Sequence, residues 1–245
     1  MRESLLSIPI SEVFEPKCGC PLCRLRDMLE ARCVEYIMGA AMMEPDVRQE
    51  TNRTGFCAEH YGMLLKQRNR LSLALMLETH LMELRRQLEK GKPPAPGSDG
   101  RAFGTKIHTF VKRTPGRAPK EASSCFVCEK IDWGMEHMLD TIFSLYSKEE
   151  SFRRLFGEQE YFCLPHYRLL LERAGEKLPK RDPDGFIQAL TAIFTRYAGQ
   201  VNADVSHYCK MYDYRNSGPN ADWGNSRDSI ERAILFLTGR DYRKS

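Results

Sequence analysis

Apolar residues recur every three or four positions through most of this chain, the spacing that places them on one face of an α-helix. The first such stripe runs from Leu22 to Ala40 and ends before a break at Glu44-Pro45-Asp46. A second stripe covers residues 58–90. The pattern therefore predicts a mainly α-helical protein.

The same scheme returns in the second half of the chain. One helical stripe covers residues 131–145, and another covers residues 186–201. A last short helix is expected at about 227–238, with Ser226 as its N-cap and Gly239 as its C-terminal stop. The two halves are therefore expected to be related.

The segment Leu71–Leu77 is apolar nearly all round. Such a segment is expected to be buried on more than one side, in a central core helix. The alternative interpretation is a surface for self-association.

Between the halves, residues 91–124 are rich in proline and glycine, as is typical of a linker. Residues 90–120 hold eight lysines or arginines against Asp99 alone, although the whole chain carries a net charge of only +4. The sequence thus predicts a first helical half at 1–90, a basic linker at 91–124, and a second helical half at 125–245 that ends in a helical tail.

Two copies of one cysteine and histidine pattern lie about a hundred residues apart. Each copy has a CxxC pair followed by a CxxH pair, and a tyrosine follows each histidine. The eight residues are Cys20, Cys23, Cys57 and His60 in the first copy, and Cys125, Cys128, Cys163 and His166 in the second.

Three thiolates and one imidazole form the donor set of a closed tetrahedral zinc site. We therefore predict two zinc ions per chain, one organising each half. Pairing within each copy is the simplest arrangement, because it closes the shorter loops. Crossed pairing, in which Cys20 and Cys23 join Cys163 and His166, is the alternative.

The nine cysteines could instead form a disulfide scaffold. That interpretation needs export, and residues 1–10 do not resemble a secretory signal. Of the cysteines outside the two copies, Cys18 is expected to be a bystander, and Cys33 lies on a helical stripe and is expected in the core. Cys209 has nothing nearby to complete a site.

No motif of a known catalytic site is present, including HExxH, GxSxG and the glycine-rich phosphate loop. Four protein ligands at each site also leave no open position on the metal. We therefore expect a protein that is not an enzyme. Because no apolar run reaches the roughly 20 residues that span a bilayer, we also expect a cytoplasmic protein without membrane contact.

The order of Ile8-Pro9-Ile10, the first CxxC pair, Asn52–Cys57 and Tyr161–His166 resembles an uncharacterised bacterial family with a domain of unknown function. Some members of that family carry transporter-type names. The resemblance spans most of the chain, and its motifs are the metal ligands. It implies a cytoplasmic helical protein with two zinc ions and no established activity.

The function expected from these observations is that of a structural zinc protein, which acts as an interaction or regulatory module for an unknown protein partner. One alternative is weak nucleic-acid binding through the basic linker, with phosphate contacts from Lys106, Lys112, Arg113 and Arg117. Another is redox sensing, in which Cys18 acts as the resolving thiol when zinc thiolates are oxidised.

Overall fold

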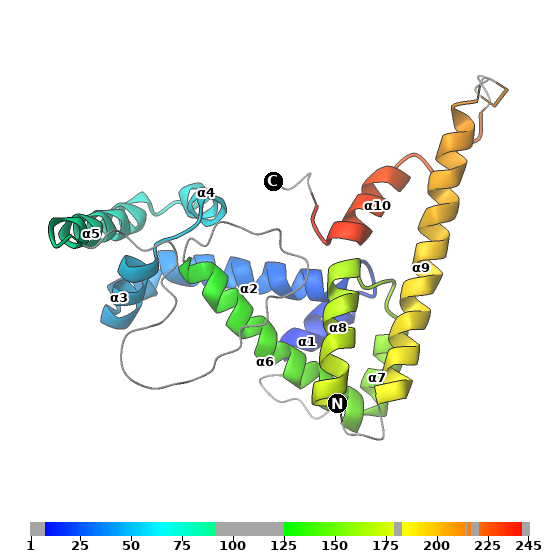
Figure 1. The fold of residues 1–245 in the computed structure, drawn as a ribbon, viewed down its shortest axis with the longest axis horizontal. Helices are drawn as coiled ribbons and strands as arrows, with labels where there is room; N and C mark the ends of the chain where they lie inside the picture. The colour runs from blue at the N-terminus through cyan, green and yellow to red at the C-terminus, as the bar shows by residue number, and fades with distance from the viewer. Residues whose placement is uncertain (1–7, 92–124, 179–182, 214, 217–220, 242–245) are drawn as a thin grey trace. The chain divides into compact units, whose positions relative to one another are not determined.

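The computed structural model describes residues 8–91, 125–178, 183–213, 215–216 and 221–241 (Figure 1). Within these ranges the chain forms ten α-helices and one short 3-10 helix, and no strand, which confirms the predicted fold class. The α-helices are α1 (Ile8–Phe14), α2 (Pro21–Met38), α3 (Pro45–Thr54), α4 (Ala58–Lys66), α5 (Arg70–Glu89), α6 (Phe126–Lys148), α7 (Glu150–Gly157), α8 (Leu164–Lys177), α9 (Pro183–Met211) and α10 (Ser229–Thr238), and the 3-10 helix covers Ala40–Met43.

The described residues divide into two compact units. Unit 1 contains residues 8–25 and 138–241, and unit 2 contains residues 26–91 and 125–137. These units do not coincide with the predicted halves, because α2 and α6 each contribute residues to both. The predicted linker lies outside the described residues, except for Gly91.

Unit 1 is built around a cluster of phenylalanines that are inaccessible to solvent. Phe156 stacks on Phe162 with the ring centroids 4.9 Å apart and also contacts Phe186 at 5.0 Å, while Phe14 packs on Phe152 at 5.1 Å. Burying each such side chain contributes about 2 kcal/mol. This core fixes α1, α7 and α9 around the segment that leads into Cys163.

A second aromatic group in unit 1 attaches α10 to α8 and α9. Tyr161 stacks on Tyr197 with the centroids 4.1 Å apart, and the ring of Phe236 lies 5.2 Å from Tyr197. The predicted last helix is confirmed as α10, which ends at Gly239 in the left-handed conformation. The predicted N-cap is wrong: Asp228 takes that position, and the hydroxyl of Ser226 donates to the carbonyl of Trp223 instead.

Unit 2 contains α3, α4 and α5, together with parts of α2 and α6. Thr79 of α5 donates to the side-chain oxygen of Asn52 on α3 at 2.7 Å, and His80 Nδ1 donates to the Asn52 carbonyl at 2.6 Å. Leu73 and Met76 are buried, but Leu71 is 69% exposed. The expectation that this segment is buried on more than one side is therefore wrong, because α5 packs through one face.

A helix long and apolar enough to cross a bilayer is not found in the described ranges.

Candidate metal centres

All four cysteine and histidine pairs lie at the starts of helices. Cys57 and Cys163 are the N-cap residues of α4 and α8, and both have extended backbone conformations. Cys20 and Cys125 directly precede α2 and α6. The carbonyls of the four leading cysteines accept the first helical hydrogen bonds, from the backbone N–H groups of Arg24, Tyr61, Glu129 and Tyr167. The second ligand of each pair therefore lies in the first helical turn, beside the first ligand.

The eight predicted ligands gather into two groups, and each group combines the CxxC pair of one copy with the CxxH pair of the other. Site A contains Cys20, Cys23, Cys163 and His166, and site B contains Cys57, His60, Cys125 and Cys128. Within each group the donor atoms all lie within 4.8 Å of one another. The prediction of pairing within each copy is wrong, and the crossed arrangement is the one observed.

Long-range packing explains why the crossed arrangement is favoured. In unit 2 the backbone N–H of Phe126 donates to the carbonyl of Gly55 at 3.0 Å, which places the two site B pairs side by side. In unit 1 Phe14, which precedes the first CxxC pair, contacts Phe162. Closing a loop of 146 residues instead of one of about 40 costs only about 1 kcal/mol more. A single buried phenylalanine contact outweighs that difference.

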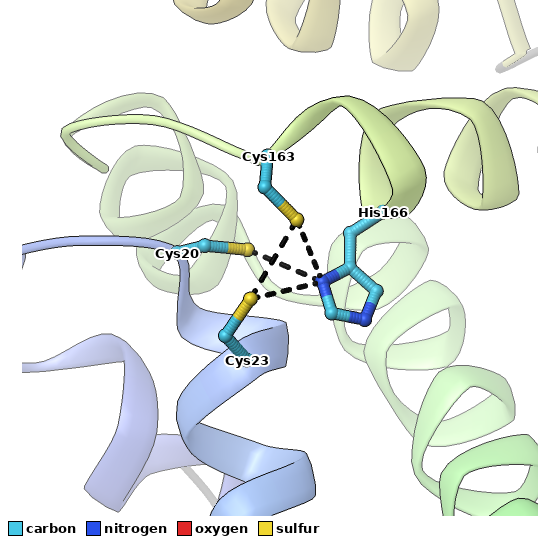
Figure 2. Close-up of side chains that lie close together, drawn as sticks. All are labelled: Cys20, Cys23, Cys163 and His166. Carbon is cyan, nitrogen blue, oxygen red and sulfur yellow. Dashed lines mark hydrogen bonds between the residues drawn. The ribbon is translucent and has the colours of Figure 1, made fainter. Parts of the chain in front are cut away.

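Site A has the dimensions of a tetrahedral centre (Figure 2). His166 Nδ1 lies 3.5 Å from the sulfur of Cys20, 3.4 Å from that of Cys23 and 3.1 Å from that of Cys163. The sulfurs of Cys23 and Cys163 are 3.6 Å apart. Zinc–sulfur bonds near 2.3 Å and zinc–nitrogen bonds near 2.0 Å imply edges of about 3.5 to 3.8 Å. The donor atoms therefore already have the separations that one ion requires.

Site B repeats this geometry and adds an orienting carboxylate. His60 Nδ1 lies 3.1 Å, 3.2 Å and 3.5 Å from the sulfurs of Cys57, Cys125 and Cys128. On the other side of the ring, Nε2 lies 2.9 Å from Oε1 of Glu30. A hydrogen bond from Nε2–H to this carboxylate leaves Nδ1 as the metal donor. Among the described residues, His166 has no such carboxylate partner.

The electrostatics of both groups favour a bound cation. Hydrogen bonding to Cys163 raises the pKa of Cys23, and hydrogen bonding to Cys128 raises the pKa of Cys125. Burial lowers the pKa of His60, but the Cys128 sulfur and Glu30 outweigh it and raise that pKa to about 10. Positive charge is thus stabilised at His60. Three thiolates in contact repel one another, and a cation between them removes that repulsion. The partly positive N-termini of two helices at each site further favour thiolates.

The three remaining cysteines belong to neither group. Cys18 and Cys209 are exposed, and Cys33 is half-buried, with its pKa raised to about 11 by burial. All nine cysteines lie in the described part of the chain and all are free, so the disulfide alternative is wrong.

Two residues at the sites were missed by sequence reasoning. Glu30 lies on α2, where a carboxylate carries no signal of its contact with a distant histidine. Gly239 was expected only to end a helix, yet its carbonyl oxygen lies 3.6 Å from the sulfur of Cys23. A Cβ atom on Gly239 would lie 3.0 Å from the sulfur of Cys163. The end of α10 therefore covers site A.

The model of a family of unknown function (DUF6062) matches residues 1–244. Neither a curated protein nor a solved structure matches the chain.

Proposed function

The chain belongs to this family, whose function is unknown, and we propose a function from its two Cys3His groups. We propose that the protein holds two structural zinc ions and acts as a non-enzymatic interaction or regulatory module. The observation that carries the proposal is the pair of four-donor groups, each assembled at two helix N-termini.

The donor set supports zinc as the metal. Thiolates and imidazole in tetrahedral geometry suit Zn²⁺, which has no geometric preference of its own, whereas Mg²⁺ and Ca²⁺ prefer oxygen ligands. Iron is the main competitor for a site rich in thiolates. Its colour and redox activity distinguish it from zinc in the purified protein.

The completeness of the donor sets supports a structural role. Catalytic zinc usually has three protein ligands and one open position for water or substrate. Here four side chains are offered at each site, and all eight are buried or half-buried. With no open position on the metal, the function of the protein is expected on its surface.

The magnitude of zinc binding supports the same role. Structural zinc contributes about 10 to 16 kcal/mol in finger peptides, which is comparable with the roughly 5 to 15 kcal/mol net stability of a whole domain. Site A joins the start of α2 to the start of α8, and site B joins the starts of α4 and α6. We therefore propose that metal and fold depend on each other in both units.

We propose that the partner is another protein, whose identity is unknown. A cytoplasmic location fits this proposal. Nucleic-acid binding through Lys106, Lys112, Arg113 and Arg117 stays a prediction, because those residues lie outside the described ranges. Redox sensing through Cys18 is the weaker alternative. Cys18 is exposed, but it is not a member of site A.

Elemental analysis tests the proposal. Protein purified under reducing conditions, without affinity metals, should contain two zinc ions per chain by plasma mass spectrometry. Removal of zinc with a strong chelator should lower helicity and the melting temperature, and added zinc should restore both. Iron at two equivalents, or an unchanged melting temperature after verified metal loss, would overturn the proposal.

A further inference from the structure

A leucine-rich seam follows α5 along its length. Apolar residues alternate at spacings of three and four, which is the pattern of the contact line in a two-helix coiled coil. The seam consists of Ala74, Leu77, Leu81, Leu84 and Leu88.

Much of this seam is open to solvent. The helix packs on α3 through its first half, and among the described residues the side-chain hydrogen bonds from α3 extend along α5 only as far as His80. Beyond that point Leu81 is 61% exposed and Leu88 is 57% exposed. Leucines exposed at coiled-coil spacing form a continuous apolar row, and an exposed apolar surface of this kind marks a contact site for a partner.

Charged residues on one edge of the seam indicate which partner fits. Glu78 and Arg85 are seven residues apart, so both lie on the same edge of the seam, and both are exposed. When two such helices run antiparallel, with Leu81 of one packed on Leu84 of the other, Glu78 of each copy lies opposite Arg85 of its partner. A parallel pair would instead bring Arg85 near His80, without charge complementarity.

We propose that α5 is a self-association surface on which a second copy of the chain docks antiparallel. Leu77, Leu81, Leu84 and Leu88 form its apolar layers, and two symmetric Glu78–Arg85 pairs set the orientation. Arg85 also contacts Glu89 of its own helix at 3.2 Å. That contact is an exposed pair of the kind that contributes little, and the guanidinium has further N–H groups for Glu78 of the second copy.

The arrangement also suits the position of α3. Because α3 covers only the first half of α5, the two α3 helices of an antiparallel pair lie at opposite ends of the contact. A short two-helix contact belongs with the smallest specific interfaces. The association should therefore depend on concentration, with a dissociation constant of roughly micromolar or weaker.

Sedimentation of the full zinc-loaded chain tests the surface. The wild type should shift from monomer towards dimer as its concentration rises, and Leu81→Asp should remain monomeric. Leu81 is exposed, so this variant should fold. The matched control is Leu237→Asp on α10, at a site 54% exposed, which should dimerise like the wild type. A wild type that is monomeric at all concentrations, or a dimer that Leu81→Asp leaves intact, overturns the proposal.

Charge exchange tests the orientation. Glu78→Arg and Arg85→Glu should each weaken the dimer at least tenfold, because each places like charges together twice. An equal mixture of the two variants should form a heterodimer, and the double variant should recover self-association. Glu35→Arg, an exposed charge reversal on α2, serves as the control and should have no effect. A mixture that stays monomeric overturns the antiparallel arrangement.

Discussion

The sulfur of Cys23 lies 3.6 Å from the carbonyl oxygen of Gly239, although 216 residues separate the two in the chain. Gly239 ends α10 with a φ of 67°. Site A is therefore closed by residues from three distant parts of the sequence: the start of α2, the start of α8 and the end of α10.

We expect Gly239→Ala to weaken site A. The new methyl group would approach the sulfur of Cys163 to 3.0 Å, and alanine is strained at this φ, at a cost of about 1 to 3 kcal/mol. Gly224→Ala is the matched control, since Gly224 also has a positive φ but open space around its Cβ position. In chelator competition, one zinc ion should leave Gly239→Ala faster than it leaves the control. Equal release from both variants would show that the contact with site A has no effect.

Crossed pairing predicts which double variants lose one metal ion and which lose two. Cys23→Ser with Cys163→Ser damages site A alone and should leave one zinc ion per chain. Cys23→Ser with Cys57→Ser damages both sites and should leave none. Pairing within each copy would give the opposite result, so metal content alone decides between the two arrangements.

Glu30→Gln should weaken site B selectively. The amide can still accept a hydrogen bond from His60, but it lacks the charge that makes the imidazole a better donor. Loss of such a partner typically lowers metal affinity by about 10 to 100-fold. We expect one of the two zinc ions to be released to a competing chelator at lower chelator concentration. Glu35→Gln, an exposed change on the same helix, should release both ions as the wild type does.

Phe156→Ala should destabilise unit 1 by about 3 to 5 kcal/mol, since the ring is inaccessible to solvent. Its neighbour Phe162 precedes Cys163, so site A should also lose zinc more readily. Trp133→Ala removes a ring that is 64% exposed and should change the unfolding free energy by less than about 0.5 kcal/mol. Denaturant unfolding with tyrosine fluorescence and circular dichroism measures both variants. Similar losses in the two would contradict the described core.

The helices and the ligand residues could be predicted from the sequence because both depend on local spacing. Apolar periodicity sets the helical faces, and a CxxC or CxxH pair places two donors at one helix start. The partners of these pairs could not be predicted in the same way. They are decided by contacts such as Phe126 with Gly55, which join segments far apart in the chain. Glu30 was missed for the same reason.

The burial of α5 shows the other limit of sequence reasoning. The run Leu71–Leu77 is apolar nearly all round, and hydrophobicity alone cannot say how many of its sides another helix will cover. In the structure α5 packs against α3 and α4, and Leu73 and Met76 are buried while Leu71 on another side of the helix is exposed.

The crossed ligand pairs impose an order on synthesis of the protein. Site B has its last ligand once the ribosome has added Cys128, whereas Cys20 and Cys23 must wait for His166. During translation the first CxxC pair is therefore a free dithiol, next to a CxxH pair that belongs to another site. A nascent chain that captured zinc with these neighbouring ligands would be trapped in the wrong topology. If the protein binds zinc as we propose, correct assembly of site A requires that the ion exchange between ligand sets or arrive after His166 has been made.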